Sequence, residues 1–199
     1  MAQRSDARQR MVQAAKQLIR ERGYHATAIS DVLERSAAPR GSVYFHFPGG
    51  KAQLAIEAAE AHAHEQVKYI DQAAEQADSA AQLIENYLDL GRDGLVASDY
   101  SRGCGIAPLV TEAAHEESPD VEATSRHAFT AMIDRLAFHF VDFGLDPTAA
   151  RQLADAVIAA TEGALVTARA LRSPAPFDAI RAVLTAQATT VARPNSPRR

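Results

Sequence analysis

Residues 27–51 read TAISDVLERSAAPRGSVYFHFPGGK, and this stretch indicates the fold more clearly than any other. Ile29, Val32 and Leu33 recur at helical spacing, which predicts a short helix over about residues 28–36 with Thr27 as its N-cap. Pro39 suits the first turn of a second helix reaching Phe47. The Pro48-Gly49-Gly50 cluster ends it. Two short helices joined by a small-residue turn predict a helix-turn-helix motif, whose second helix enters the DNA major groove.

The second of these helices carries four side chains that donate hydrogen bonds, namely Arg40, Ser42, Tyr44 and His46. An arginine there can hold guanine O6 and N7 through a bidentate contact, the commonest specific base contact. Gly41 would let the backbone approach the duplex. We expect Phe45 and Phe47 in the core and Tyr44 toward DNA, because a tyrosine hydroxyl needs a partner. The ring of His46 could instead pack against the following helix.

The charge distribution supports a polyanionic partner for the N-terminal part. The whole chain has a net charge of −4, yet residues 1–52 carry +5 and the remainder −9. A basic segment joined to an acidic one is expected where one end of a protein meets nucleic acid.

Composition predicts a helical, cytoplasmic protein. Hydrophobic residues make up 47% of the 199 residues, and alanine, the best helix former, is frequent. One cysteine excludes an internal disulfide and suits a reducing compartment. The chain shows neither a signal peptide nor an apolar run of membrane-spanning length, so we expect no membrane partner.

Helical periodicity predicts an all-α fold of about nine helices, with Ser5 capping the first and Gly23 ending it. The others are expected over about 28–36, 40–47, 51 to the late seventies, 80–97, 106–114, 119–143, 147–171 and 176–191. We assign residues 1–50 to a three-helix DNA-binding domain and 51–192 to a helical ligand-binding and dimerisation domain. Residues 193–199 are expected to be a disordered tail.

The stretch from Met11 to Leu54 resembles the DNA-binding domain of TetR-family regulators. The resemblance rests on Gly23-Tyr24, Thr27, the run Gly41-Ser42-Val43-Tyr44-Phe45-His46-Phe47, and Lys51. Ala37 departs from it, since the family usually has glycine in the turn, and so does Ala38-Pro39. The Pro-Gly-Gly-Lys junction and Arg102-Gly103-Cys104-Gly105 are similar to a branch of multidrug-resistance repressors of the LmrA type.

The resemblance implies a regulator that binds a palindromic operator as a homodimer and is released by a small hydrophobic molecule. It implies that Arg40, Gly41, Tyr44 and His46 face DNA. Thr27, Ser30 and Lys51 would hold flanking phosphates or the groove edge, and Lys51 also precedes a helix N-terminus that favours phosphate. With Ser42, these eight residues form the predicted DNA contact set.

The effector site is expected between helices of the second domain. Polar residues on apolar faces and part of an aromatic stripe would line it, namely Gln66, Asn86, Tyr87, Phe129, Met132 and Thr161. The polar members could equally be buried groups that satisfy one another.

The last two helices are the predicted dimer surface, forming a four-helix interface across a two-fold axis. The residues expected there are small or branched apolar ones: Leu153, Val157, Ala160, Ala164, Ala168, Ile180, Val183 and Leu184.

Other classes of protein stay open as alternatives. A helical enzyme or carrier with a non-functional N-terminal domain is one, although no catalytic motif is present and no cofactor is expected. A thiol sensor acting through Cys104 is another, set against a small buried hydrophobic cysteine. A metal site is not expected, because His62 and His64, two apart on a helix, cannot share a face.

Overall fold

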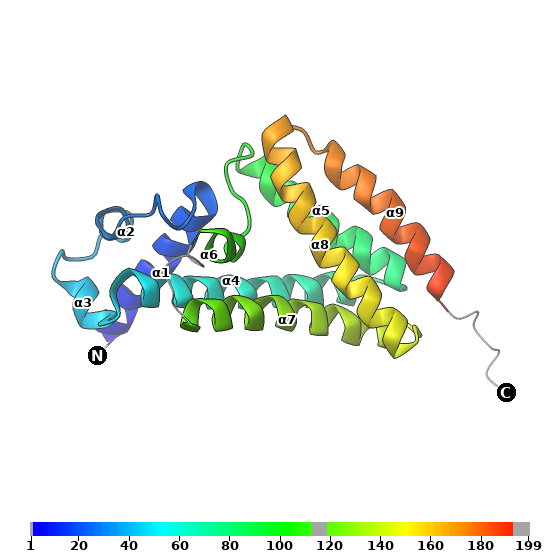
Figure 1. Ribbon diagram of the computed structural model, residues 1–199, viewed down its shortest axis with the longest axis horizontal. Coiled ribbons are helices and arrows are strands. Elements are labelled where there is room, and N and C mark those ends of the chain that lie inside the picture. Colours follow the sequence, from blue (N-terminus) through cyan, green and yellow to red (C-terminus); the bar gives the residue numbers. More distant parts are fainter. Residues whose placement is uncertain (1, 113–118, 193–199) are drawn as a thin grey trace. The chain divides into compact units, whose positions relative to one another are not determined.

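The computed structural model describes residues 2–112 and 119–192, and every regular element in these ranges is a helix (Figure 1). The predicted all-α fold of about nine helices is confirmed. The helices are α1 (Ala2–Arg22), α2 (Ile29–Ser36), α3 (Ser42–His46), α4 (Gly50–Glu75), α5 (Ala80–Ala97), α6 (Ala107–Thr111), α7 (Pro119–Asp142), α8 (Pro147–Leu171) and α9 (Ala175–Val191). Among the described residues, no helix is both long and apolar enough to cross a membrane.

The helices form two compact units, residues 1–65 with 101–128 and residues 66–100 with 129–199. The predicted functional division after residue 50 does not coincide with this one, because α4 begins at Gly50 and its N-terminal part, to Glu65, belongs to the first unit. That division therefore stays a prediction about function. The tail predicted over 193–199 lies outside the described residues.

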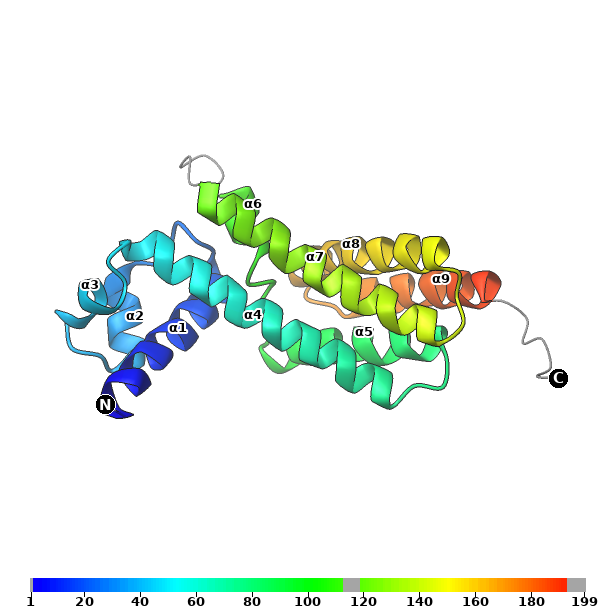
Figure 2. The same cartoon turned by 90° about the horizontal axis from the view of Figure 1, so that it is seen from below.

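The first unit contains α1, α2, α3 and α6 with the N-terminal parts of α4 and α7 (Figure 2). Its core is built from buried side chains of the first four helices, chiefly Met11, Ile19, Val32 and Leu54, together with Phe47 directly after α3. Burying such side chains contributes about 1.5–3 kcal/mol each, so this core holds the two short helices against α1 and α4.

Three local predictions about helix starts are wrong. The helix α1 begins at Ala2, so Ser5 lies inside it. Ala28 occupies the N-cap of α2 without a side-chain hydrogen bond, while Thr27 Oγ1 donates to the carbonyl of Gly23 at 2.7 Å. Pro39 does not open α3, because its carbonyl accepts a turn hydrogen bond from the backbone of Ser42 at 2.9 Å. The predicted stop at Gly23 is confirmed, with φ +91°.

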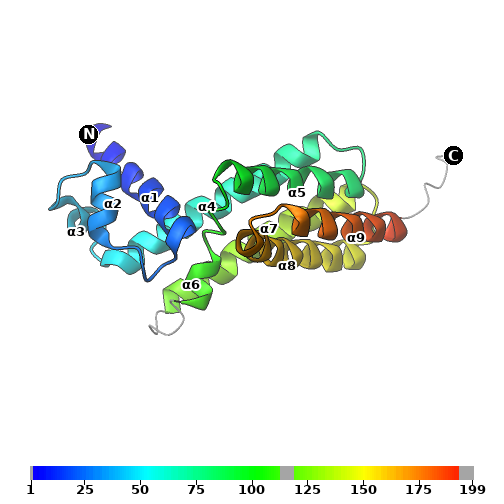
Figure 3. The same ribbon diagram turned by 90° about the horizontal axis from the view of Figure 1, so that it is seen from above.

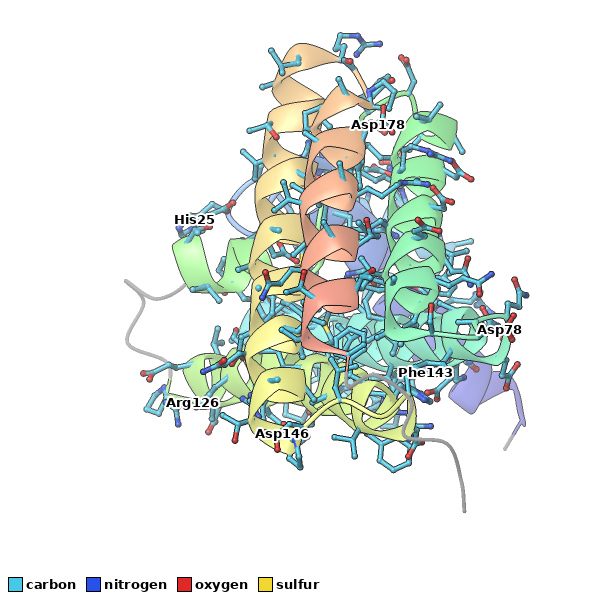
Figure 4. The ribbon with its side chains drawn as sticks, turned by 90° about the vertical axis from the view of Figure 1, so that its right-hand side faces the viewer. His25, Asp78, Arg126, Phe143, Asp146 and Asp178 are labelled. Atoms are coloured by element: carbon cyan, nitrogen blue, oxygen red, sulfur yellow. The ribbon has the colours of Figure 1, made fainter. Side chains whose placement is uncertain are left out.

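The second unit is organised around α5, α8 and α9, which pack on one another (Figures 3 and 4). Asp146 caps α8, its side chain accepting from the Thr148 N–H at 2.9 Å. In Figure 4, Asp146 and Asp178 mark the starts of α8 and α9 at opposite ends, so the two helices run antiparallel. Phe140, Leu136 and Phe177 are fully buried in this unit.

Five of the eight residues predicted for the dimer surface are instead buried within the single chain. They are Leu153, Val157, Ala164, Ala168 and Leu184. Each lies on a face of α8 or α9 that packs inside the second unit, and an apolar stripe looks the same in sequence whether it packs within a chain or between chains. Ala160 and Ile180 are half-buried, and Val183 is exposed.

The six residues predicted for the effector site all belong to the second unit. Asn86 donates its amide to the carbonyls of Ala73 and Gln76, and Thr161 donates to the carbonyl of Val157, so the protein's own backbone satisfies both donors. Tyr87 and Met132 are buried, whereas Gln66 and Phe129 are half-buried.

Candidate nucleic-acid interface

The turn after α2 has a left-handed residue where the sequence carries alanine. Ala37 adopts φ 52° and ψ 34°, and the N–H groups of Ala37 and Ala38 donate to the carbonyls of Glu34 and Leu33. This is the way many helices end, usually with glycine because it avoids the steric penalty of a Cβ there. Ala37 therefore keeps the turn at a conformational cost of about 1 kcal/mol.

A second turn separates Ala37 from α3. Both the N–H and the hydroxyl of Ser42 donate to the carbonyl of Pro39, at 2.9 and 2.6 Å. The helix α3 accordingly covers only Ser42–His46, shorter than the predicted 40–47. Arg40 and Gly41 lie in this turn, before the helix begins. The Ser42 hydroxyl thus has a structural role in the free protein.

Two side chains fix the direction in which α3 presents its residues. Val43 and Phe47 are fully buried, one helical turn apart, and anchor α3 in the core of the first unit. Tyr44 and Phe45 are 67% and 68% exposed. The prediction that Phe45 is a core residue is wrong, whereas that for Phe47 is confirmed. The four-residue spacing of Val43 and Phe47 was the signal that excludes Phe45 from the buried face.

Arg40 is exposed and has no hydrogen bond or ion pair with any described residue. The other basic side chains described in residues 6–51 are all engaged. Arg8 pairs with Glu57, Arg10 with Asp6, Lys16 with Glu65, Arg22 with Asp31 and Arg35 with Glu21, while Arg20 and Lys51 donate to carbonyls. Among the arginines and lysines described in this segment, Arg40 is therefore the one that can bind an external anion or a base without first breaking an internal hydrogen bond or ion pair.

Arg40 shares a concave surface with two other predicted contact residues, Ser30 and Tyr44. This surface lies between α2 and the turn preceding α3, and its remaining lining is Ile29, Leu33, Glu34, Ala37 and Ala38. Gly41 is exposed beside it, and a Cβ added there would meet no atom within 4 Å. The fold thus brings together Ser30, Arg40, Gly41 and Tyr44 around one open surface.

The remaining predicted contact residues are placed differently. Thr27 is buried and its hydroxyl is occupied, so we remove it from the contact set. Lys51 lies over the Tyr24 ring, 4.4 Å from the centroid, and donates to the carbonyl of His25 at 3.2 Å. His46 is half-buried, with its ring against those of its neighbours Phe45 and Phe47, so its packing against the following helix stays a prediction.

Sequence reasoning missed a contact that holds the turn between α1 and α2. Glu112, just after α6, accepts from the His25 N–H at 2.8 Å, and its carbonyl lies 3.0 Å from His25 Nε2. Its carboxylate occupies the space beside Gly23, where a Cβ would lie 2.4 Å from Oε1. The two segments are 87 residues apart, and no local pattern signals the pairing.

The alternative sites receive no added support. Cys104 is buried, and the N–H groups of Ile106 and Ala107 point to its Sγ at 3.3 and 3.5 Å. Within the described ranges, no group of three or more His, Cys, Asp or Glu side chains could hold a metal ion. His62 is buried and His64 exposed, which agrees with their expected placement on different faces.

Family profiles match both parts of the chain. Residues 11–58 match the profile described as bacterial regulatory proteins, tetR family, and residues 80–183 match the C-terminal domain of LmrA/YxaF-like transcriptional regulators. An uncharacterised HTH-type transcriptional regulator of Mycobacterium tuberculosis is 40% identical over 177 residues, covering 87% of this chain and 89% of the relative. The HTH-type transcriptional regulator LmrA of Bacillus subtilis is 49% identical over 53 residues, 27% of this chain and 28% of the relative.

Solved structures share the fold. A TetR transcriptional regulator from Legionella pneumophila superposes with a TM-score of 0.78 at 19% identity, covering 90% of this chain and 95% of the other. A regulatory protein TetR from Rhodobacter sphaeroides also gives 0.78, at 22% identity, covering 91% and 98%.

Proposed function

The chain belongs to the TetR family of bacterial transcriptional regulators, in its LmrA/YxaF-like branch, and we propose that it is a repressor released from a palindromic operator by a small hydrophobic molecule. The helix-turn-helix would read the operator, and two copies would present two such motifs.

The unpaired Arg40 beside Tyr44 is the observation that supports this proposal most strongly. An exposed arginine without a partner among the described residues loses none of their ion pairs on binding DNA, and its five donors suit the major-groove edge of guanine. Tyr44 and Ser30 offer hydroxyls on the same surface for phosphates or bases. The +5 charge of residues 1–52 would add sequence-independent attraction.

Selection of bound sequences from a random duplex DNA pool tests the proposal. A two-fold symmetric regulator selects a palindromic consensus whose half-sites lie about one helical turn apart, about 34 Å, or a multiple of it. Failure to enrich any sequence at a salt concentration that suppresses nonspecific binding, together with no binding of duplex DNA at low salt, would count against a DNA-binding function.

The homodimer is proposed through α8 and α9. Val166, Leu171 and Val183 are large apolar side chains about two-thirds exposed on these helices, and a monomer would leave them in water. The half-buried Ala160 and Ile180 would extend the surface. An isologous interface of this kind places one copy of each helix on either side of a two-fold axis.

The effector is proposed to bind within the second unit, where Gln66, Tyr87, Phe129 and Met132 are the residues expected to contact it. Release follows from linkage: a molecule that prefers the DNA-free conformation lowers operator affinity, and operator lowers the affinity of that molecule by the same factor. Calorimetric titration of a releasing compound with and without saturating operator would reveal this reciprocity. Equal affinities in the two titrations would contradict release by linkage.

A further inference from the structure

Phe45 is the side chain that projects most directly outward from α3. Successive residues of an α-helix are rotated by about 100°, so the buried Val43 and Phe47 lie about 40° apart and define the inward direction. Phe45 lies about 180° from their midpoint. Its ring is 68% exposed, slightly more than that of Tyr44. Whatever the outer face of α3 docks against must therefore meet Phe45.

The exposed part of this phenylalanine ring is best covered by a surface that is apolar at least in part. It can neither donate nor accept an ordinary hydrogen bond, and it gains nothing from a phosphate charge. The surface around it is polar and cationic, with Arg40 and the Tyr44 hydroxyl nearby in the chain. The ring touches the ring of His46 but lies outside the core, because Val43 and Phe47 are the residues that anchor α3.

The major groove offers such a ring one strongly apolar group. Every base pair presents hydrogen-bond donors and acceptors there, and thymine presents its C5-methyl group as well. Resting on the DNA-binding function proposed above, we propose that Phe45 is a specificity-determining residue that contacts the C5-methyl of one thymine in each operator half-site. Arg40 and Tyr44 then supply polar contacts, and Phe45 supplies the apolar one.

Replacing thymine by deoxyuridine isolates this contact, because it removes the methyl group and leaves every hydrogen-bonding group in place. Each thymine of the selected operator is replaced in turn, symmetrically in both half-sites, and affinity is measured for the wild-type protein and for Phe45→Ala. The wild type should lose about fourfold per half-site at one position, the fold-change equivalent to about 0.8 kcal/mol for a buried methyl-sized group. The symmetric substitution then costs about fifteenfold.

Phe45→Ala should bind the thymine and deoxyuridine operators equally at that position. The exposed ring makes no core contribution, so its thermal unfolding should match that of the wild type, and measurements at lower salt bring weakened binding into range. Phe138→Ala is the matched control, since Phe138 is a half-exposed phenylalanine of α7 in the other unit. It should keep the full sensitivity to deoxyuridine.

Two outcomes would overturn the inference. One is a wild-type protein indifferent to deoxyuridine at every thymine, and the other is Phe45→Ala retaining the wild-type sensitivity. Both leave the DNA-binding proposal standing, because a sequence has then been enriched and bound. Failure of that proposal has a different signature, the absence of any enriched sequence.

Discussion

Among single residues, His62 is the buried group with the most demanding surroundings. It lies in α4 of the first unit and is 3% exposed, and Gly105 packs so closely that a Cβ there would lie 2.8 Å from the ring. Its Nδ1 is 3.8 Å from Glu65 Oε2 and has no hydrogen-bond partner in the part of the chain that the structure describes. Lys16, also buried, donates to the same carboxylate at 3.2 Å, and Arg20 of α1 adds positive charge nearby.

Burial lowers the pKa of His62 from its ordinary value of 6.5, so the folded protein keeps this imidazole neutral where the unfolded chain would protonate it. The unfolded state then binds more protons below about pH 6.5, and stability falls as the pH drops. We expect His62→Gln to flatten the dependence of the melting temperature on pH between 7.5 and 5.5, measured by calorimetry. An unchanged slope would contradict this role.

Glu65 responds at a lower pH. The neighbouring imidazole of His62 and the Lys16 ammonium hold the pKa of Glu65 at about 2, below its ordinary value of 4.5. Its contribution to stability is therefore present above about pH 4.5 and is lost between there and about pH 2. The two acid-sensitive ranges of the first unit are therefore coupled, because His62 is itself the largest cause of the lowered pKa of Glu65.

At the scale of elements, the turn from α1 to α2 depends on Gly23. Its φ of +91° is unfavourable for a side chain, and the Glu112 carboxylate fills the space that a Cβ would need. We expect Gly23→Ala to lower stability by about 1–2 kcal/mol, equivalent to roughly 2–8 °C in melting temperature for a chain of this size.

Gly94→Ala provides the control for that experiment. Gly94 lies within α5, and a Cβ there meets nothing within 4 Å. Alanine should leave stability unchanged or raise it by about 0.5–1 kcal/mol, because it replaces glycine in a helix. Equal effects of the two substitutions would show that the turn at Gly23 has no special requirement.

The sequence predicted which helices form, but it predicted only some of their first and last residues correctly. The stop at Gly23 and the helix over 147–171 were predicted correctly, because each end carries local backbone chemistry that needs no distant partner. The length of α3 was overestimated. Proline is common both in turns and at helix starts, and here Pro39 forms a turn with Ser42 instead of opening the helix. The Glu112–His25 contact could not be found, because it depends on tertiary packing alone.

At the scale of the whole molecule, periodicity could not separate the internal core from a surface between copies. Leu153 and Val157 pack inside the chain, whereas Val183 is exposed, yet all three belong to the same kind of apolar stripe. Burial relative to neighbouring helices distinguishes them, and that information is absent from a single sequence. The same reasoning explains why Asn86, satisfied by backbone carbonyls, looked like a ligand anchor.

Val183 is exposed, so substituting it tests the proposed dimer without disturbing the core. We expect Val183→Glu to give monomers in sedimentation velocity at micromolar concentration while keeping the wild-type helical content. Operator affinity should fall with it, because two linked half-site contacts become independent. Val157→Glu is expected to unfold the second unit instead, since that position is fully buried. A Val183→Glu protein that stays dimeric would move the interface elsewhere.

The central claim is that the surface around Arg40 reads base sequence, and a comparison of Arg40→Ala with Lys51→Ala tests it most directly. Both variants, with the exposed Arg126→Ala as control, are measured on the selected operator, on its single-base variants and across a salt series. Arg40→Ala should cost about 1–3 kcal/mol and relax specificity at one base pair per half-site. Lys51→Ala should lower the affinity for all sequences similarly and make the salt dependence shallower by about one unit for each phosphate that the lysine no longer neutralises. Arg126→Ala should change neither the affinity nor its salt dependence. An Arg40→Ala protein that loses the same affinity for every sequence, or none at all, would contradict the claim.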